Sequence, residues 1–288
     1  MPTVAITGAT GFLGSVLVDY FLQKNWKVIA LSRKPGQKKH IHLAYRDYDL
    51  SSPVDDTLLN DIDYIVHAAY VKAADNASAL DVNVTGAENL ISAIKKSNVK
   101  QVIFISSMSA HPGAISIYGK QKLYTERLFS KLENSTIIRP GLIVGNGGIV
   151  KEMSTIMATK HVVPIIDGGG QPLQIISVFD LATAIYNIFQ RSLYGRYVVA
   201  TTKVYKYKDF YKALAKQIHV NVIYVPIPYT VLLGIFKIVS LLPIKLGVGE
   251  DNLKGLKKLV SMQSASDLRK IGIIPDDLTT ALAKLTVL

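Results

Sequence analysis

Tyr118 and Lys122 are the two residues whose spacing most directly suggests chemistry. They are four positions apart, so on a helix they would lie on one face. A protonated Lys122 close to the phenol would favour the phenolate, which would let Tyr118 exchange a proton near neutral pH. Ser107 follows the apolar run Val102–Ile105, and its hydroxyl could hydrogen-bond the oxygen of a reacting carbonyl or alcohol. Such a pair occurs by chance in many helices, but here a phosphate-binding motif precedes it, and we interpret the three residues as a catalytic set.

A glycine-rich turn near the N-terminus is the feature that would bring a cofactor to these residues. Thr7–Gly14 reads Thr-Gly-Ala-Thr-Gly-Phe-Leu-Gly; it follows an apolar run and opens a helical pattern. The first glycine permits a tight turn, the second lets the backbone approach a pyrophosphate at the helix N-terminus, and the third allows close packing of helix on strand. At the first strand-to-helix turn of an alternating chain, this motif indicates dinucleotide binding. The predicted cofactor contacts here are Gly8, Thr10, Gly11, Phe12, Leu13 and Gly14.

The end of the second apolar run indicates which dinucleotide is preferred. Proteins that prefer NAD usually place an acidic residue there to accept the ribose hydroxyls. This chain has Ser32, Arg33 and Lys34 instead; the two cations could hold a 2′-phosphate, or they could be solvated charges on a loop. We therefore predict that NADP(H) is preferred and that NAD(H) can also bind. Ser32 and Arg33 are assigned to the cofactor, and Asp49 and Leu50, after the third strand, could meet the adenine.

Short apolar runs alternate with helix-length periodic segments from residue 3 to about residue 140. The runs are continuous, which is typical of parallel strands buried on both faces. This alternation predicts an α/β fold with a Rossmann-type, doubly wound parallel sheet. The expected strands are Val4–Ile6, Val28–Leu31, Tyr64–Val66, Val102–Ile105 and Thr136–Ile138, and the expected helices are Phe12–Lys24, Ala77–Ser97 and Tyr118–Leu132.

The alternation of apolar runs and helix-length segments ends after Gly141, where glycine clusters and proline-bearing loops recur. We expect residues 1–145, with parts of 175–205 packed on them, to form the dinucleotide-binding domain. Residues 146–288 would form a small mixed C-terminal subdomain for the substrate. The elements expected in this half of the chain are a helix near Val178–Arg191, a strand at Arg196–Ala200 and a helix near Lys208–Gln217.

Composition narrows the classes of function. The 288 residues include no cysteine, which excludes disulfides and thiolate metal sites, and we predict no metal site. The formal net charge of +12 fits a lysine-rich surface, or the steering of a polyanionic ligand or an anionic membrane. The basic residues are scattered and form no arm or stripe, so nucleic-acid binding is not expected. The N-terminus lacks the basic and long apolar regions of a signal peptide, and we expect a cytoplasmic protein.

The segment Tyr229–Leu246 is unusually apolar. It is short for a membrane span, and Lys237 and Pro243 interrupt it. A helix that is apolar all round must be buried in protein or must meet lipid or a partner. We expect a buried cap helix that forms a lid over the substrate. A membrane-surface patch aided by Lys237 and Lys245 is the alternative.

These motifs together resemble the extended and atypical short-chain dehydrogenase/reductases, the NAD(P)-dependent epimerase/dehydratase family. Thr7–Gly14 is similar to the family's Thr-Gly-x-x-Gly-x-x-Gly, and Ser107, Tyr118 and Lys122 fall on its catalytic positions. Further stretches resemble its fourth strand, the following helix, the loop that closes over the nicotinamide and a common C-terminal ending: Asp63–Ala69, Asn83–Gly86 with Asn89-Leu90, Arg139–Gly145 and Asp267–Pro275. The resemblance implies cofactor contacts at His67, Ala68, Ala69, Tyr118, Lys122 and Pro140.

The resemblance also implies an NAD(P)-dependent oxidoreductase, a reductase or epimerase whose small-molecule substrate is a sugar linked to a nucleotide. The cofactor would deliver hydride to a keto carbon while Tyr118 supplies the proton. Lys122 would adjust the pKa of Tyr118 and bind the nicotinamide ribose. Ser107 would orient the reacting oxygen of the substrate. An epimerase would oxidise and reduce the same carbon on opposite faces. Family members often pair through the helix that carries the Tyr-Lys motif, which implies a homodimer.

Two departures from the family pattern support a second hypothesis. The stretch between Ser107 and Tyr118 is shorter than the substrate loop of typical sugar-nucleotide epimerases, and Leu173 stands where many members have an arginine that grips the substrate pyrophosphate. The short loop and the apolar segment also resemble the atypical branch related to a respiratory complex I accessory subunit. The alternative is thus a cofactor-binding protein that docks to a membrane or complex and turns over little. The complete Ser-Tyr-Lys set favours the enzyme.

The basic residues after the second strand generate a testable prediction. NADPH should bind more tightly than NADH, and Arg33→Ala should weaken NADPH binding by about 1.5–3 kcal/mol, because a charge-assisted phosphate contact is lost. NADH binding should change little, which makes it the internal control. Calorimetric titration of both cofactors into both proteins measures the effect, and equal affinities in the unsubstituted protein would contradict it.

Overall fold

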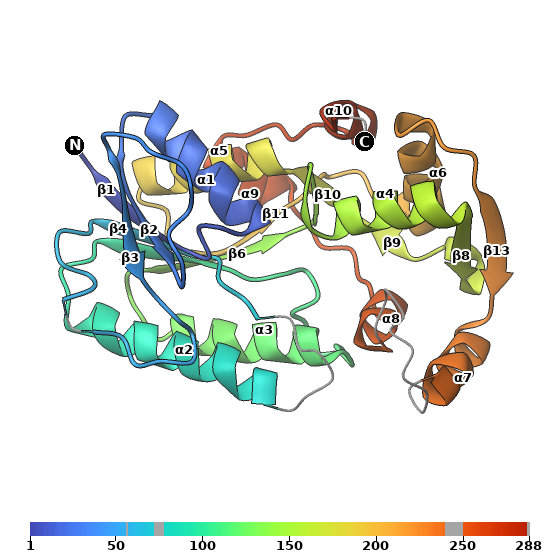
Figure 1. The fold of residues 1–288 in the computed structure, drawn as a ribbon, viewed down its shortest axis with the longest axis horizontal. Coiled ribbons are helices and arrows are strands. Elements are labelled where there is room, and N and C mark those ends of the chain that lie inside the picture. The colour runs from blue at the N-terminus through green and yellow to red at the C-terminus, as the bar shows by residue number, and fades with distance from the viewer. Residues whose placement is uncertain (56, 72–77, 240–249, 287–288) are drawn as a thin grey trace.

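A seven-stranded parallel sheet forms the centre of the molecule (Figure 1). The computed structural model describes the chain except residues 56, 72–77, 240–249 and 287–288. The strand order β11-β6-β5-β4-β1-β2-β3 confirms the predicted doubly wound fold. The strands are β1 (Thr3–Thr7), β2 (Lys27–Ser32), β3 (Leu43–Asp47), β4 (Tyr64–His67), β5 (Gln101–Ile105), β6 (Ser135–Pro140) and β11 (Gly195–Val199).

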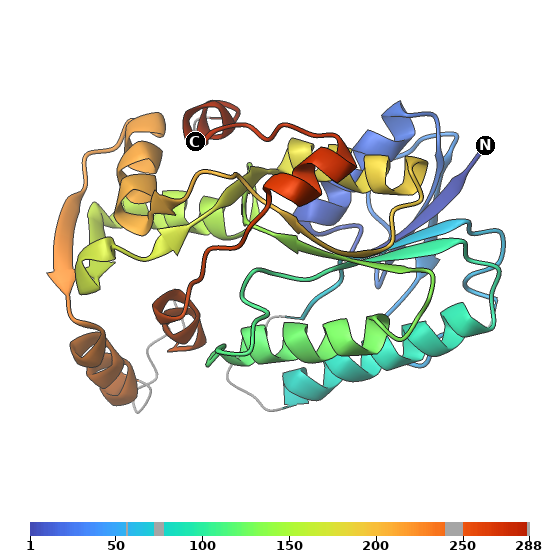
Figure 2. The ribbon, with the colours of Figure 1, turned by 180° about the vertical axis from the view of Figure 1, so that it is seen from behind.

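Helices cover both faces of this sheet, which explains why its central strands are mostly apolar. α1 (Phe12–Gln23) and α5 (Val178–Gln190) pack on one face, and α2 (Ser78–Lys95) and α3 (Ile117–Phe129) lie on the other (Figure 2). Every residue of β1 and β5 is buried. Because side chains on both faces enter an apolar layer, a strand of alternating polarity would not fit at these positions.

The strand order places a change of direction at β1. β2 and β3 extend from one side of β1, and β4, β5, β6 and β11 extend from the other. Parallel strands end at a common edge, so Thr7 lies level with His67, and His67 lies level with Phe104. Ligands of open α/β sheets bind at this edge, at the point where the strand order reverses. The glycine turn, the end of β4 and Ser107 therefore all follow strands that end there.

A second lobe with its own apolar core follows β6. Three helices and a parallel pair of strands surround this core, and Figure 1 shows them beside the sheet. These elements are α4 (Gly148–Lys160), α6 (Tyr207–Gln217), α10 (Leu278–Ala283), β8 (Val162–Ile166) and β13 (Ile223–Ile227). Two shorter strand pairs are β7 (Leu142–Val144) with β10 (Ile175–Ser177), and β9 (Pro172–Leu173) with β12 (Tyr205–Lys206). The helix α9 (Ala265–Ile271) returns to contact α5 and β11.

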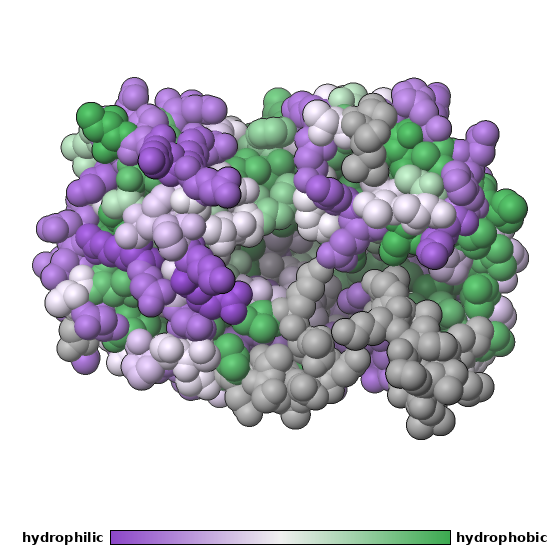
Figure 3. Space-filling model, viewed as in Figure 1, coloured by the Kyte–Doolittle hydropathy of each residue, from purple (hydrophilic) through white to green (hydrophobic). Residues whose placement is uncertain are grey.

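The apolar segment begins as α7 (Tyr229–Val239), which packs against α8 (Glu250–Lys257). Tyr229 and Leu253 are buried in one small cluster, and Leu232 and Leu233 pack against it. Tyr229, Leu232 and Leu233 thus pack on protein, whereas Val231 is exposed. Residues 240–246 lie outside the described residues. Of the helices described, none combines the length and apolar character that crossing a bilayer requires. On the face shown in Figure 3, hydrophilic side chains are spread over both lobes with apolar ones between them.

Elements whose bounds the sequence did not reveal have weak local patterns. β3 is an edge strand without a continuous buried run. α4 begins at Gly148, inside a glycine cluster that reads as a loop. β8 contains Pro164, which is tolerated because the strand belongs to a two-stranded pair.

Candidate active site

The glycine turn after β1 can be built only from glycine at two of its positions. Gly8 has φ +68°, and a Cβ there would lie 2.9 Å from the Cα atom of Ala69. A Cβ on Gly14 would overlap the carbonyl oxygen of Gly8. The amide of Gly11 donates to the same carbonyl at 2.9 Å and closes the turn. The first and third glycines thus set the turn and bring α1 close to the strand.

The N-terminus of α1 fits an anionic group. Gly11 is the N-cap of this helix, and in the described structure no side chain caps it and no acidic residue occupies its first turn. The first backbone N–H groups and the positive end of the helix dipole therefore face the turn, where a pyrophosphate would be stabilised. The ring of Phe12 packs against Gly145, Gly147 and Gly148. Thr10 is exposed and Leu13 half-buried at the same helix end.

Thr7 organises the end of β4 beside this turn. Its hydroxyl accepts hydrogen bonds from the amides of Ala68 and Ala69, each at 3.1 Å, and lies 2.8 Å from Nδ1 of His67. The imidazole of His67 is buried and packs against the ring of Phe104. Burial lowers the pKa of His67 to about 3, and the nearby charge of Lys122 acts in the same direction. His67 is thus neutral. Because its imidazole is buried against Thr7, only its main chain is available to a cofactor.

The adenosine end of the predicted site lies at the ends of β2 and β3. The Ser32 hydroxyl donates to the Lys34 carbonyl at 2.7 Å, and the side chains of Arg33 and Lys34 are exposed. Asp49 accepts hydrogen bonds from the amide and hydroxyl of Ser51; these bonds and the charge of Arg33 hold its pKa below the usual value. Arg33 is thus an exposed cation with the Asp49 carboxylate close enough to interact with it. Leu50 is buried and packs against Gly86.

Ser107, Tyr118 and Lys122 meet at the end of β5. The Ser107 side chain lies close enough to the Tyr118 phenol to lower its pKa, and the Lys122 ammonium donates to the Ile105 carbonyl at 2.8 Å. Burial lowers the pKa of Lys122 to about 7, and Glu126 opposes this shift. Burial also raises the pKa of Tyr118, against the hydrogen bond with Ser107. Tyr118 therefore keeps its proton at neutral pH.

The second lobe fixes the end of the helix that carries Tyr118. Asp251 of α8 accepts hydrogen bonds from the backbone N–H groups of Ile117, at 2.6 Å, and Tyr118, at 3.1 Å. The Ser116 hydroxyl caps the same helix by accepting from the Gly119 amide at 3.1 Å. Asp251 is remote in sequence, and no local motif pointed to it. The position of Tyr118 thus depends on a contact between the two lobes.

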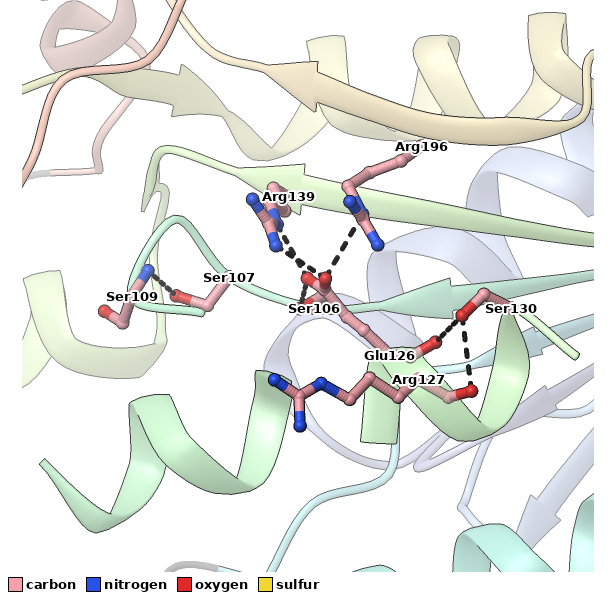
Figure 4. Close-up of polar contacts among 8 residues, drawn as sticks. All are labelled: Ser106, Ser107, Ser109, Glu126, Arg127, Ser130, Arg139 and Arg196. Carbon is pink, nitrogen blue, oxygen red and sulfur yellow. Dashed lines mark hydrogen bonds and ion pairs between the residues drawn. The ribbon is translucent and has the colours of Figure 1, made fainter. Parts of the chain in front are cut away.

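Glu126 of α3 is a residue that we did not predict, and it links this helix to β6 and β11 (Figure 4). Its carboxylate is fully buried and accepts the Ser106 hydroxyl at 2.5 Å. Arg139 donates to both carboxylate oxygens, at 2.7 and 2.6 Å, and Nε of Arg196 lies 3.2 Å away. Figure 4 shows both guanidinium groups converging on the one carboxylate. The spacing of Lys122 and Glu126, four residues on one helix face, was the signal that could have identified it.

Pro140 ends β6 at the same edge of the sheet as Ser107. It is buried, and its carbonyl lies 3.4 Å from the amide of Met108. Gly141 follows with its Cα packed on the backbone of Gln174. The structure therefore brings all the predicted catalytic residues and Pro140 to one edge. The role of each residue toward a cofactor or substrate stays a prediction.

A family model and several known proteins match this chain. The model of the NAD dependent epimerase/dehydratase family matches residues 4–200. A UDP-N-acetylglucosamine 4,6-dehydratase (inverting) of Campylobacter jejuni is 25% identical over 258 residues, which cover 76% of this chain and 73% of that protein. A UDP-glucose 4-epimerase of Rickettsia prowazekii is 28% identical over 145 residues, 44% of this chain.

The chain spans only part of some of these relatives. It covers 42% of the Rickettsia protein and 51% of a further Campylobacter dehydratase. Solved structures match over a greater length. The crystal structure of a UDP-glucose 4-epimerase of Thermotoga maritima with UDP-glucose has a TM-score of 0.73 at 19% identity, covering 98% of this chain and 96% of that one. At this identity the likeness is one of fold.

The buried carboxylate generates a testable prediction. Glu126→Gln keeps the shape of the side chain but leaves the largely buried Arg139 without a counter-charge, so the free energy of unfolding should fall by about 3 kcal/mol. Urea denaturation measures the change. Glu133→Gln, at an exposed carboxylate beyond the end of the same helix, is the control and should change stability by less than about 0.5 kcal/mol. Equal stability of the two variants would show that the charge network does not hold the helix.

Proposed function

This chain belongs to the NAD-dependent epimerase/dehydratase family, and we propose that it is a reductase or epimerase of a nucleotide-linked sugar. The observation that carries the proposal is the meeting of Ser107, Tyr118 and Lys122 at the sheet edge where the glycine turn opens. The nucleotide-sugar substrate is supported by the names of the relatives from Campylobacter and Rickettsia. Residues 1–145 with parts of 175–205 would bind the dinucleotide, and residues 146–288 the substrate.

The proposed chemistry is a hydride transfer coupled to a proton transfer. The nicotinamide, when bound, supplies the hydride donor or acceptor. Tyr118 gives its phenolic proton to the substrate oxygen when a keto carbon is reduced, and takes a proton back when the alcohol is oxidised. Ser107, already bonded to that phenol, orients the same oxygen. Lys122 favours the phenolate when charged and holds the ribose of the cofactor.

NADP(H) is the proposed preference within this NAD-dependent family. Arg33 and Lys34 are exposed where β2 ends, and the hydrogen bonds of Asp49 to Ser51 leave the guanidinium available. A 2′-phosphate at this place would meet two cations. The packing of Tyr229, Leu232 and Leu233 with Leu253 favours an enzyme with a packed lid over the docking protein. A homodimer and a cytoplasmic location stay predictions.

Tyr118→Phe tests the proposal because it keeps the ring and removes the exchangeable proton. Turnover of UDP-glucose or UDP-N-acetylglucosamine, followed by NMR, should fall by about 10²–10⁴-fold, while calorimetric binding of NADPH stays nearly intact. Tyr124→Phe, at an exposed tyrosine of the same helix, is the matched control and should keep full turnover. Equal turnover in the Tyr118 and Tyr124 variants would remove Tyr118 from the mechanism.

A further inference from the structure

Tyr70 contacts three residues of the catalytic helix from outside it. It follows Ala69 directly, in the stretch after β4. Its ring meets the ring of Tyr118 edge-on, with the centroids 5.1 Å apart and the planes at 90°. Its hydroxyl donates to Oε1 of Gln121 at 2.9 Å, and its ring centroid lies 4.9 Å from the ammonium of Lys122. A single side chain therefore links the cofactor edge of the sheet to the predicted proton donor and its lysine.

The ammonium of Lys122 lies between two aromatic rings. Tyr70 and Phe104 are at 4.9 and 4.8 Å from Nζ, and Tyr118 is at 5.9 Å. The negative face of an aromatic ring attracts a cation, and the attraction is strongest where water is excluded. Lys122 is buried, and the Ile105 carbonyl accepts its hydrogen bond at 2.8 Å. The rings thus replace part of the hydration that the ammonium loses.

The backbone next to Tyr70 is fixed from α2. The side-chain amide of Asn83 accepts from the Val71 amide at 2.8 Å and donates to the Val71 carbonyl at 2.9 Å. Asn83 is itself buried. Both backbone groups of the residue after Tyr70 are therefore held by one side chain, which keeps the ring at its place against α3.

We propose that Tyr70 is the positioning residue of the catalytic pair: its ring holds the Lys122 ammonium beside Tyr118, and its hydroxyl fixes the helix through Gln121. This inference rests on the proposed function, in which Lys122 must meet the cofactor ribose. Phe104, the other ring, belongs to the core of the sheet, whereas Tyr70 comes from the cofactor edge. Tyr70 is thus the member of the pair of rings that a bound cofactor would approach.

Burial and the carboxylate of Glu126 act in opposite directions on the pKa of Lys122. Its pKa of about 7 means that part of the protein carries a neutral Lys122 near pH 7. Contact with ribose hydroxyls favours the charged form, so NADPH binding should take up protons in this range. Among the residues that the structure describes, the charged or titratable groups that face Lys122 or Tyr70 are Glu126 and Tyr118 on α3, Tyr70 itself, His67 on β4 and Asp251 on α8.

Proton uptake on NADPH binding tests the proposal without any substrate. Calorimetry in two buffers of different ionisation enthalpy, between pH 6 and 9, gives the protons bound per NADPH. Tyr70→Leu removes one aromatic face, so the pH at which uptake begins should move down by about half to one unit. At pH 7 more protons should then be bound per NADPH. Tyr70→Phe keeps the face and should leave the curve in place.

Controls separate this inference from the function on which it rests. Lys122→Met should abolish the uptake, and Tyr124→Leu, on the outer side of the same helix, should leave the curve unchanged. A Tyr70→Leu curve that superimposes on the wild type, or a Tyr70→Phe curve that shifts equally, would overturn the proposal. Persistent uptake in Lys122→Met would overturn it too. Because the readout needs no sugar, failure to turn over nucleotide-sugars would not affect it.

Discussion

The burial of one positive charge is the constraint on which the rest of the site depends. The Lys122 side chain is almost fully buried, and taking an ammonium out of water costs several kcal/mol unless partners replace the water. The Ile105 carbonyl and two aromatic rings are those partners, and Glu126 lies one turn further along the helix. Glu126 is buried in turn and needs the guanidinium groups of β6 and β11. The buried groups of Lys122 and Glu126 thus tie α3 to β5, β6 and β11.

The second lobe completes the arrangement from the other side. Asp251 holds the first backbone amides of α3, and the His111 ring lies 2.9 Å from the Lys258 carbonyl. Gln174 holds two distant segments together through the carbonyls of Thr201 and Met262. Tyr118 is thus positioned by both lobes, so a change in their relative placement would move the phenol relative to the cofactor edge.

Much of the fold and part of the site could be predicted from the sequence. The continuous apolar runs identified the central strands, because strands buried on both faces are mostly apolar. Their few polar residues, such as Thr7 and Gln101, are hydrogen-bonded inside the fold. The spacing of Thr7–Gly14 and of Tyr118 with Lys122 reflects local geometry, which one segment of chain determines by itself. These motifs also led to the family, which the match over residues 4–200 confirms, together with its class of NAD-dependent enzymes.

Other parts of the site could not be predicted, because they arise from contacts between distant segments. Tyr70, Asp251 and Arg196 reach the catalytic helix from three different parts of the chain, and no periodicity records such contacts. The raised pKa of Tyr118 is a similar case. The Tyr-x-x-x-Lys spacing alone suggested a lowered value, but the depth of burial that decides the direction appears only in the folded chain.

A single turnover tests whether hydride passes between a nicotinamide and a sugar carbon while Tyr118, supported by Lys122, moves the proton. UDP-glucose is mixed rapidly with the protein loaded with NADP⁺, and the near-ultraviolet absorbance of reduced nicotinamide is followed. A reductase run in reverse and an epimerase both pass through a reduced cofactor. We therefore expect this absorbance to rise with the wild-type protein and not with Tyr118→Phe. If calorimetry shows that both ligands bind but no reduced nicotinamide forms, the proposed hydride transfer is wrong.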